Sequence, residues 1–267
     1  MVKRPSKRRL DAELVRQGLF PDTETALRAI LAGDVSTHER RLTSAGELVE
    51  EGLFLHVRHT LPYVSRGGLK LERALDAFDV SPEGLTCLDI GASSGGFTDC
   101  LLQRGALQVT SVDVGYAQFD WSLRNNVRVK LLERTNVTAL PGLGYEASFD
   151  LAVCDVSFTS VAHILPATLV TLKPTGAFIT LVKPQFEADK TEVDDGGVVT
   201  SAKTRLAALT RVAQLFSQAG LGPIAACESP IHGAKGNVEY LLFGRKGVKP
   251  AVLDLKAVVE KHTVVRV

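Results

Sequence analysis

Cysteine is scarce in this chain of 267 residues, and its spacing excludes the usual metal and disulfide patterns. The four cysteines lie far apart in the sequence, without a CxxC or CxxxH pair: Cys87, Cys100, Cys154 and Cys227. A zinc site or a disulfide framework is therefore not expected, and no bound metal is expected. Cysteines that lack such a framework favour a reducing compartment, so we expect the protein in the cytoplasm.

Long apolar runs and an excess of one charge are missing as well. No run of about 18 apolar residues occurs, which argues against a transmembrane helix. The amino terminus, MVKRPSKRRL, is not followed by an apolar h-region, so no secretory signal is expected. The 31 basic and 30 acidic residues leave a net charge of +1, and 45% of the residues are hydrophobic. This composition indicates a globular protein of one or two domains.

Basic residues are nevertheless concentrated at the start of the chain, where residues 1–9 contain five of them and no acidic residue. Apolar residues at helical spacing follow at 10–18 and 25–32, and Asp22 or Thr23 can cap the second helix. Short apolar segments between residues 35 and 57, interrupted by Gly46 and Gly52, predict small strands. We expect a compact α+β domain over residues 1–62.

The segment RLDAELVRQGLFPDTETALRAILAGDV resembles the alpha-L RNA-binding motif, a small module of ribosomal and RNA-modifying proteins. The resemblance implies RNA binding, because clustered cations displace counterions from a polyanionic backbone. A solvated helix face with a frayed basic tail is the alternative. Where such modules carry a V-x-Asn-Gly turn, this chain has VSTHE at 35–39, so a different hairpin is expected. The residues expected to contact RNA are Arg4, Lys7, Arg8, Arg9, Arg28, Arg40, Arg41 and Arg66.

From residue 86 onward, apolar segments of strand length alternate with helical patterns. The expected strands are 86–90, 109–113, 127–132, 149–154, 177–182, 223–227 and 238–243, and the main expected helices are 97–104, 160–171 and 203–219. This alternation predicts an α/β, Rossmann-like fold with a doubly wound, mostly parallel, seven-stranded sheet. Ligands of such sheets bind beyond the carboxyl ends of the strands.

A glycine-rich turn follows the first of these strands, in the sequence DIGASSGGFTD at 89–99. Glycines at a strand-to-helix turn let the backbone approach a ligand closely. The second strand ends at Asp113, where a carboxylate can accept hydrogen bonds from ribose hydroxyls. The ligand could be NAD or S-adenosylmethionine. The GxxxGG spacing and the polar Ser93-Ser94 pair favour S-adenosylmethionine, which has no phosphates.

Ionisable residues also stand at other strand ends. Asp155 follows FDLAVC, Lys183 follows AFITLV, and Glu239 lies near the start of the last strand. A lysine at the end of an apolar strand is unusual, because burial of its ammonium group is costly unless carboxylates compensate. Lys70 follows a glycine pair in SRGGLK at 65–70. A structural ion network under the sheet is the alternative to a catalytic role.

Lys70, Asp155, Lys183 and Glu239 occur in the order of the Lys-Asp-Lys-Glu tetrad of FtsJ-like RNA 2′-O-methyltransferases. From about residue 7 to residue 244 the chain resembles the hemolysin-A-like (TlyA) branch of that group, in the strings YVSRGGLKLERAL, DIGASSGGFTDCLLQRGA, VDVGYAQ, LLERTN, CDVSF, LVKPQFEA, GGVV and GNVEYLL. The resemblance implies an S-adenosylmethionine-dependent enzyme that methylates ribose 2′-hydroxyls of cytidines in ribosomal RNA. The residues that it assigns to the cofactor are Asp89, Gly91, Ala92, Ser94, Gly95, Gly96, Phe97, Asp113, Val114, Thr135, Asn136 and Asp155.

The resemblance also suggests roles within the tetrad. Lys183 is the expected general base or hydroxyl-orienting group, with Asp155 and Glu239 positioning it and Lys70 steering the hydroxyl or the neighbouring phosphate. Other classes of function are a non-catalytic RNA-binding assembly factor, a small-molecule methyltransferase and a membrane-active hemolysin. A hemolysin needs an amphipathic or apolar segment that can insert, and none of useful length is found.

The remaining segments are assigned by position. Residues 63–82 are expected to form a connecting segment with the helix that carries Lys70, and residues 83–247 the methyltransferase domain. Segment 186–201 is expected to be a lid over the substrate or a simple connection to the next helix. The tail 248–267 is expected to be a packing helix or a dimer contact. The expected partners are ribosomal RNA or ribosomal subunits, with a monomeric or homodimeric protein and no membrane.

Overall fold

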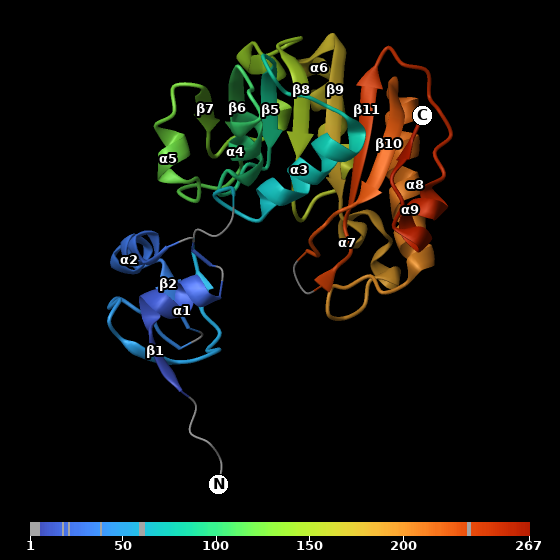
Figure 1. The fold of residues 1–267 in the computed structure, drawn as a ribbon. Helices are drawn as coiled ribbons and strands as arrows, with labels where there is room; N and C mark the ends of the chain where they lie inside the picture. The colour runs from blue at the N-terminus through green and yellow to red at the C-terminus, as the bar shows by residue number, and fades with distance from the viewer. Residues whose placement is uncertain (1–5, 18, 21, 38, 59–61, 234–235) are drawn as a thin grey trace. The chain divides into compact units, whose positions relative to one another are not determined.

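The computed structural model describes residues 6–17, 19–20, 22–37, 39–58, 62–233 and 236–267. The chain divides into two compact units, Met1–Pro62 and Tyr63–Val267 (Figure 1). Arg4, one of the residues expected to bind RNA, lies outside the described residues. Among the described residues, no helix combines the length and the apolar character needed to cross a membrane.

The first unit is built from two short helices and two small sheets. Helix α1 (Leu10–Arg16) and helix α2 (Thr23–Leu31) accompany strands β1 (Lys7–Arg9) and β3 (Leu48–Glu50), which pair with each other, and β2 (Val35–Ser36) and β4 (His56–Val57), which form the second pair. Asp22 caps α2 by accepting a hydrogen bond from the Thr25 backbone N–H at 2.7 Å. Apolar side chains of both helices and of the strands form a separate core, which includes Leu10, Leu14, Ile30, Val35 and Leu42.

The second unit is organised around one mixed sheet with the strand order β12-β10-β11-β9-β8-β5-β6-β7. The strands are β5 (Thr86–Ile90), β6 (Gln108–Val112), β7 (Val129–Leu132), β8 (Phe149–Cys154), β9 (Leu172–Val182), β10 (Leu221–Glu228), β11 (Tyr240–Lys246) and β12 (Val265–Arg266). Strands β7, β6, β5, β8 and β9 are parallel, and β11, β10 and β12 pair antiparallel. The expected mostly parallel, doubly wound architecture is confirmed.

The sheet has eight strands, so the expected number of seven was wrong by one. The additional strand is β12, which pairs with β10 through Ala225 and Ala226. It comes from the tail 248–267, which also supplies helix α9 (Leu255–Lys261). Leu255, Val258 and Val259 of α9 are buried in the core of their own unit. The tail therefore packs on the sheet as expected for a packing helix.

Helices cover both faces of this sheet (Figure 1). Helix α3 (Gly67–Phe78) and helix α4 (Gly96–Gln103) pack on one face, whereas α6 (Val161–Thr171), α8 (Ala202–Gln218) and α9 pack on the other. Short helices α5 (Trp121–Arg124) and α7 (Pro184–Glu187) follow β6 and β9. Strands buried on both faces explain the nearly continuous apolar runs in the sequence.

Antiparallel pairing decides which residues reach the carboxyl edge of the sheet. Because β11 runs opposite to β9, its first residue, Tyr240, is paired with Val182, the last residue of β9. The residue before β11 and the residue after β9, Glu239 and Lys183, therefore meet at the same edge. This is the edge at which β5, β6 and β8 also end.

Candidate active site at the carboxyl edge of the sheet

The loop after β5 comes very close to the loop after β8. Gly91 has φ of +80°, and a Cβ atom at this position would lie 2.7 Å from the backbone oxygen of Asp155. Only glycine allows both this left-handed conformation and this approach. The loop can therefore place its backbone beside the end of β8, where a ligand of the sheet would bind.

One cavity of about 420 Å³ lies over the ends of β5, β6 and β8. Asp113 stands at its wall, and its carboxylate accepts hydrogen bonds from the backbone N–H groups of Ser93 (2.8 Å) and Gly115 (2.6 Å). These two bonds hold the loops after β5 and β6 together, and the carboxylate keeps lone pairs for the hydroxyls of a ribose. Thr135 and Asn136 also line this cavity.

A second cavity, of about 320 Å³, adjoins the first and lies under the amino end of α3. Four residues line both cavities: Gly91, Ser93, Asp155 and Ser157. We call the first the nucleoside cavity and the second the transfer cavity. Their shared wall, the carboxylate at the end of β6 and the open glycine turn fit an adenosine joined to an amino acid, as in S-adenosylmethionine.

Most of the residues expected to bind the cofactor line these cavities. Gly91 and Asp155 line both, while the other lining residues divide between the nucleoside cavity (Asp113, Val114, Thr135, Asn136) and the transfer cavity (Ala92, Ser94, Gly96, Phe97). Sequence reasoning missed several lining residues, among them Gln118, Ser157 and Phe158. The strings around them are part of the resemblance, but nothing local marks these side chains as facing a cavity.

Two of the expected cofactor residues lie outside both cavities. Asp89 is fully buried within β5, where it accepts a hydrogen bond from Thr98 Oγ1 at 2.6 Å, and burial raises its pKa to about 7. Gly95 faces α5 instead, because a Cβ atom there would lie 2.5 Å from Leu123 Cδ1. Neither residue lines a cavity, so a contact of either with the cofactor stays a prediction.

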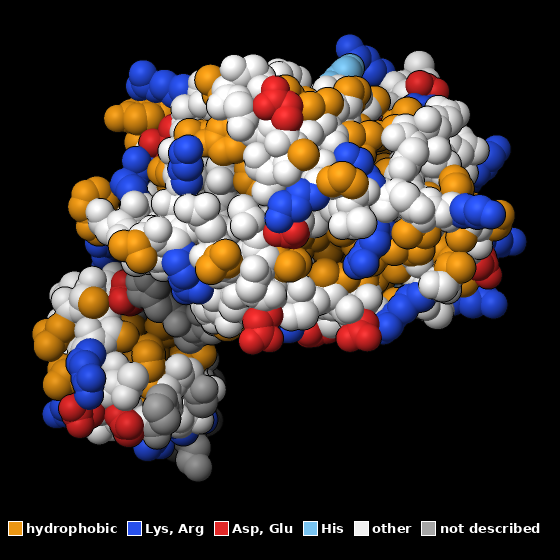
Figure 2. Space-filling view, turned by 90° about the horizontal axis from the view of Figure 1, so that it is seen from above, with side chains coloured by type: hydrophobic (Ala, Val, Ile, Leu, Met, Phe, Trp, Pro, Cys, Tyr) orange, Lys and Arg blue, Asp and Glu red, His pale blue; other side chains and the backbone are white. Residues whose placement is uncertain are grey.

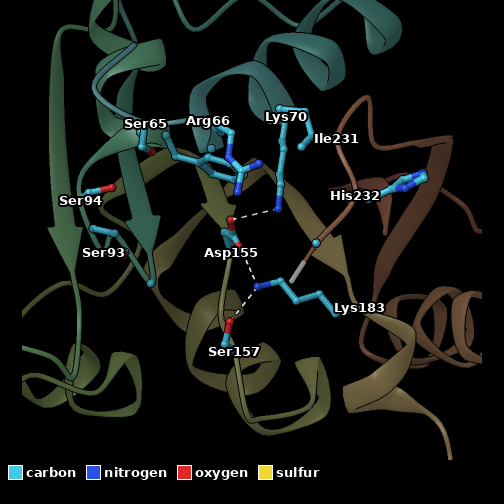
Figure 3. Close-up of a pocket in the computed structure, with 16 residues that line it drawn as sticks. Ser65, Arg66, Lys70, Ser93, Ser94, Asp155, Ser157, Lys183, Ile231 and His232 are labelled. Carbon is cyan, nitrogen blue, oxygen red and sulfur yellow. Dashed lines mark hydrogen bonds and ion pairs between the residues drawn. The ribbon is translucent and has the colours of Figure 1, made fainter. Parts of the chain in front are cut away.

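Three residues of the expected tetrad, Lys70, Asp155 and Lys183, line the transfer cavity, and Glu239 lies behind them in contact with Lys70. Asp155 lies between the two lysines: its Oδ1 is 2.6 Å from Lys183 Nζ and its Oδ2 is 4.0 Å from Lys70 Nζ. Lys70 Nζ also donates to Glu239 Oε2 at 2.6 Å. Figure 3 shows Lys70 and Lys183 reaching toward Asp155 from two sides. The four side chains thus form one connected ion network, although their positions span 169 residues.

Because the side chains of this network are largely buried, loss of one ion-pair partner would cost free energy. The side chains of Lys183 and Glu239 expose only 9% and 3% of their surface. A buried ion without a partner costs several kcal/mol, so each lysine depends on its carboxylate. Glu239 contacts Lys70 and is not paired with Lys183, which corrects the expectation that Glu239 positions Lys183. The reason is the reach of α3, which brings Lys70 over the amino end of β11.

Two further residues complete the network and were not anticipated. Lys183 Nζ donates to Ser157 Oγ at 2.9 Å. Gly233 lies against Glu239, and a Cβ atom there would be 2.1 Å from Glu239 Oε1. His232 is exposed at the rim of the transfer cavity, and its ring points away from Asp155 in Figure 3.

The segment 186–201 is held by specific hydrogen bonds at its carboxyl end. The side chain of Asn237 accepts from Val199 N at 3.0 Å and donates to Gly197 O at 2.9 Å. Arg205 of α8 donates to Thr200 O at 2.7 Å. These bonds favour the connecting role over that of a lid.

The residues expected to bind RNA differ in their electrostatic surroundings. Within the first unit, Arg8, Arg9, Arg28 and Arg40 pair with Glu51, Asp11, Glu24 and Glu47, respectively. Lys7, Arg41 and Arg66 are exposed, and no ion pair to another described residue is found for them. Arg66 lines the transfer cavity. Figure 2 shows basic side chains scattered among neutral and hydrophobic ones on the visible face.

The fold and the two joined cavities define a Rossmann-like, S-adenosylmethionine-dependent methyltransferase. The family model of the FtsJ-like methyltransferases matches residues 63–246, and the chain belongs to this family. The family predicted from the sequence motifs is therefore confirmed.

Relatives match nearly the whole chain. The 16S/23S rRNA (cytidine-2′-O)-methyltransferase TlyA of Mycobacterium tuberculosis is 42% identical over 239 residues, which cover 89% of each chain. Hemolysin A of Brachyspira hyodysenteriae is 38% identical over 234 residues, 87% of this chain and 98% of that one. A solved structure from Streptococcus thermophilus, named as a hemolysin, has a TM-score of 0.72 at 38% identity and covers 97% of this chain and 96% of its own.

Proposed function

We propose that this protein transfers a methyl group from S-adenosyl-L-methionine to the 2′-hydroxyl of a cytidine ribose in ribosomal RNA. The observation that carries the proposal is the Lys70–Asp155–Lys183–Glu239 network, in which both lysines and Asp155 line a cavity joined to the nucleoside cavity. The name of the Mycobacterium tuberculosis relative supports the choice of cytidine and of ribosomal RNA.

The chemistry requires alignment and removal of one proton. The bound sulfonium cofactor supplies an electrophilic methyl group that is already activated. The 2′-hydroxyl is a weak nucleophile at neutral pH and must lose its proton as its oxygen forms the new carbon–oxygen bond. Lys183 accepts this proton at Nζ, and Asp155 keeps Nζ at the shared wall of the two cavities. Lys70, held by Glu239, orients the hydroxyl or the adjacent phosphate.

The first unit would supply affinity for RNA. Contacts between its cations and phosphates release counterions, so binding should weaken steeply with salt. Arginines that already pair with carboxylates must exchange that partner for a phosphate, so Lys7 and Arg41 are the more available cations of this unit, and Arg66 is a further one in the second unit. Ribosomal RNA lies in the cytoplasm, which is where we place the protein.

The direct test is incubation with labelled S-adenosylmethionine and ribosomal subunits from a strain that lacks the gene, followed by mapping of the label. Labelled cytidine 2′-O-methyl groups are the expected result. Label in neither subunit, with measurable cofactor binding, would favour the assembly-factor function. Lysis of red cells by the purified protein at low concentration would instead favour the hemolysin function suggested by the names of two relatives.

A further inference from the structure

Ser157 occupies a position at which both cavities and the ion network meet. It lines the nucleoside cavity and the transfer cavity, and its Oγ accepts a hydrogen bond from Lys183 Nζ at 2.9 Å. Figure 3 shows Lys183 reaching Asp155 on one side and Ser157 on the other. Lys183 therefore has two partners in the site, one charged and one neutral.

The two partners differ in what they can offer when Lys183 changes its protonation state. A carboxylate only accepts hydrogen bonds, so Asp155 holds an ammonium group well and offers nothing to the lone pair of a neutral amine. A serine hydroxyl both accepts and donates. Ser157 can accept from the ammonium form and, after rotation of its hydroxyl, donate to the neutral amine. It can thus keep Nζ in place before and after proton transfer.

The loop that carries Ser157 is fixed from the segment that follows Lys183. Glu187, at the end of α7, is buried, and its carboxylate accepts from Ser160 Oγ at 2.7 Å and from Val161 N at 2.8 Å. These bonds tie the amino end of α6 to a point four residues beyond Lys183. These hydrogen bonds connect the loop after β8 to the loop after β9. They therefore help to fix the distance between Ser157 and Lys183.

We propose that Ser157 is a positioning residue that holds the Lys183 amine at the shared wall of the cavities in both protonation states. The proposal rests on the proposed function, in which Lys183 accepts the proton of the 2′-hydroxyl. It predicts that the hydroxyl of residue 157 matters for the rate and not for cofactor affinity.

The test measures single-turnover methylation of ribosomal RNA across a range of pH, together with calorimetric binding of S-adenosylmethionine, for the full-length protein. Ser157→Ala should lower the rate about 10- to 100-fold, the loss expected for one hydrogen bond to a charged group. The loss should be similar at every pH, because the contact serves both forms of Lys183. Ser157→Thr should restore the rate, whereas Ser157→Cys should not, because a thiol is a weak hydrogen-bonding group.

Ser148→Ala is the matched control. Ser148 directly precedes β8, it lines neither cavity, and its hydroxyl donates to Glu146 O at 3.2 Å. This variant should keep the parent rate.

Three results would overturn the role of Ser157. They are a Ser157→Ala rate equal to the parent rate, a loss confined to one end of the pH range, or a loss matched by weaker cofactor binding. The parent protein is the internal reference, because absence of methyl transfer by the parent would contradict the proposed function itself.

Discussion

At the scale of single residues, the central feature is that one carboxylate serves two lysines. Asp155 contacts Lys183 directly and lies 4.0 Å from Lys70, which Glu239 holds from the other side. Two ammonium groups and two carboxylates balance in charge, so the network tolerates its burial. Removal of any one member leaves an uncompensated charge among largely buried side chains.

Two substitutions test the role of Lys183: one removes its positive charge and the other keeps it. Lys183→Ala should reduce methyl transfer by about 100- to 10,000-fold, the usual contribution of a general base. Lys183→Arg should not rescue, because a guanidinium group stays protonated and cannot accept the hydroxyl proton. Single-turnover assays measure the rate, and calorimetry should show unchanged cofactor binding. A Lys183→Ala variant that is as fast as the parent would refute the assignment.

Gly233 gives a steric test of the Lys70–Glu239 pair. A methyl group at residue 233 would collide with Glu239 Oε1, so Gly233→Ala should displace this carboxylate from Lys70. We expect a rate loss of about tenfold or more, since a buried charged hydrogen bond is weakened. Gly142→Ala, where a Cβ atom meets nothing within 4 Å, is the matched control. Equal rates for the two variants would show that Glu239 does not need its present position.

The tetrad could be predicted from sequence because each member lies in a motif with a recognisable neighbourhood. Ser157 and Gly233 could not, because their roles depend on what lies opposite them in space. Gly95 shows the same limit: a glycine in the turn is visible in the sequence, but the direction that it faces is not. Its open side is filled by Phe119 and Leu123.

At the scale of elements, the packing of β5 against α4 contains a buried polar group. Asp89 Oδ2 accepts from Thr98 Oγ1, which lies 2.7 Å from Ser111 Oγ, while Asp89 Oδ1 has no hydrogen-bond partner in the described structure. Burial is the main cause of the raised pKa of Asp89. Ionisation of this buried carboxyl therefore lowers the free energy of unfolding.

This cost predicts a pH dependence of stability. Because the pKa of Asp89 is about 7 in the fold and lower in the unfolded chain, the fold binds more protons between these values. Its contribution to the free energy of unfolding is therefore full at low pH and declines as pH rises to about 7, by up to roughly 4 kcal/mol. Asp89→Asn should lack this decline. Urea unfolding of both proteins from pH 4 to 8 would measure it, and parallel curves would contradict it.

The tail 248–267 contains a two-residue strand, β12, which forms by pairing with β10. Strand β12 has two residues and no visible alternation of its own, so sequence patterns could not predict it, whereas the apolar spacing of α9 was visible. Val258 of α9 is fully buried, and Val252, just before the helix, is 99% exposed. The same residue type thus occurs in opposite environments within one segment.

Substitution of Val258 and of Val252 measures how much the packing of α9 contributes to the stability of the second unit. Val258→Ala should lower the free energy of unfolding by about 2 kcal/mol, from lost apolar burial and the cavity that remains. Val252→Ala should change it very little. Both values come from chemical denaturation. Equal values for the two variants would mean that α9 is not docked on the sheet in solution.

At the scale of the whole molecule, two units with separate cores divide the proposed work between RNA capture and chemistry. Both cavities are lined only by residues of the second unit, among the residues that the structure describes. Cofactor binding should therefore not need the first unit.

Removal of residues 1–62 tests this division. The truncated protein should bind S-adenosylmethionine with nearly the parent affinity, and it should bind ribosomal RNA more weakly with a shallower dependence on salt. Calorimetry and filter binding at several salt concentrations give both quantities. Unchanged RNA affinity would place the RNA-binding surface in the second unit.

The reversed direction of β11 also limits how this protein can vary in length. Glu239 reaches the network only because it stands one residue before Tyr240, which is paired with Val182. Side chains alternate between the faces of a strand, so one residue inserted after Glu239 would turn its carboxylate away from Lys70. Insertions in the exposed stretch around Asp195 would leave this geometry unchanged. Evolution can therefore lengthen the chain on one side of α8 but not immediately before β11.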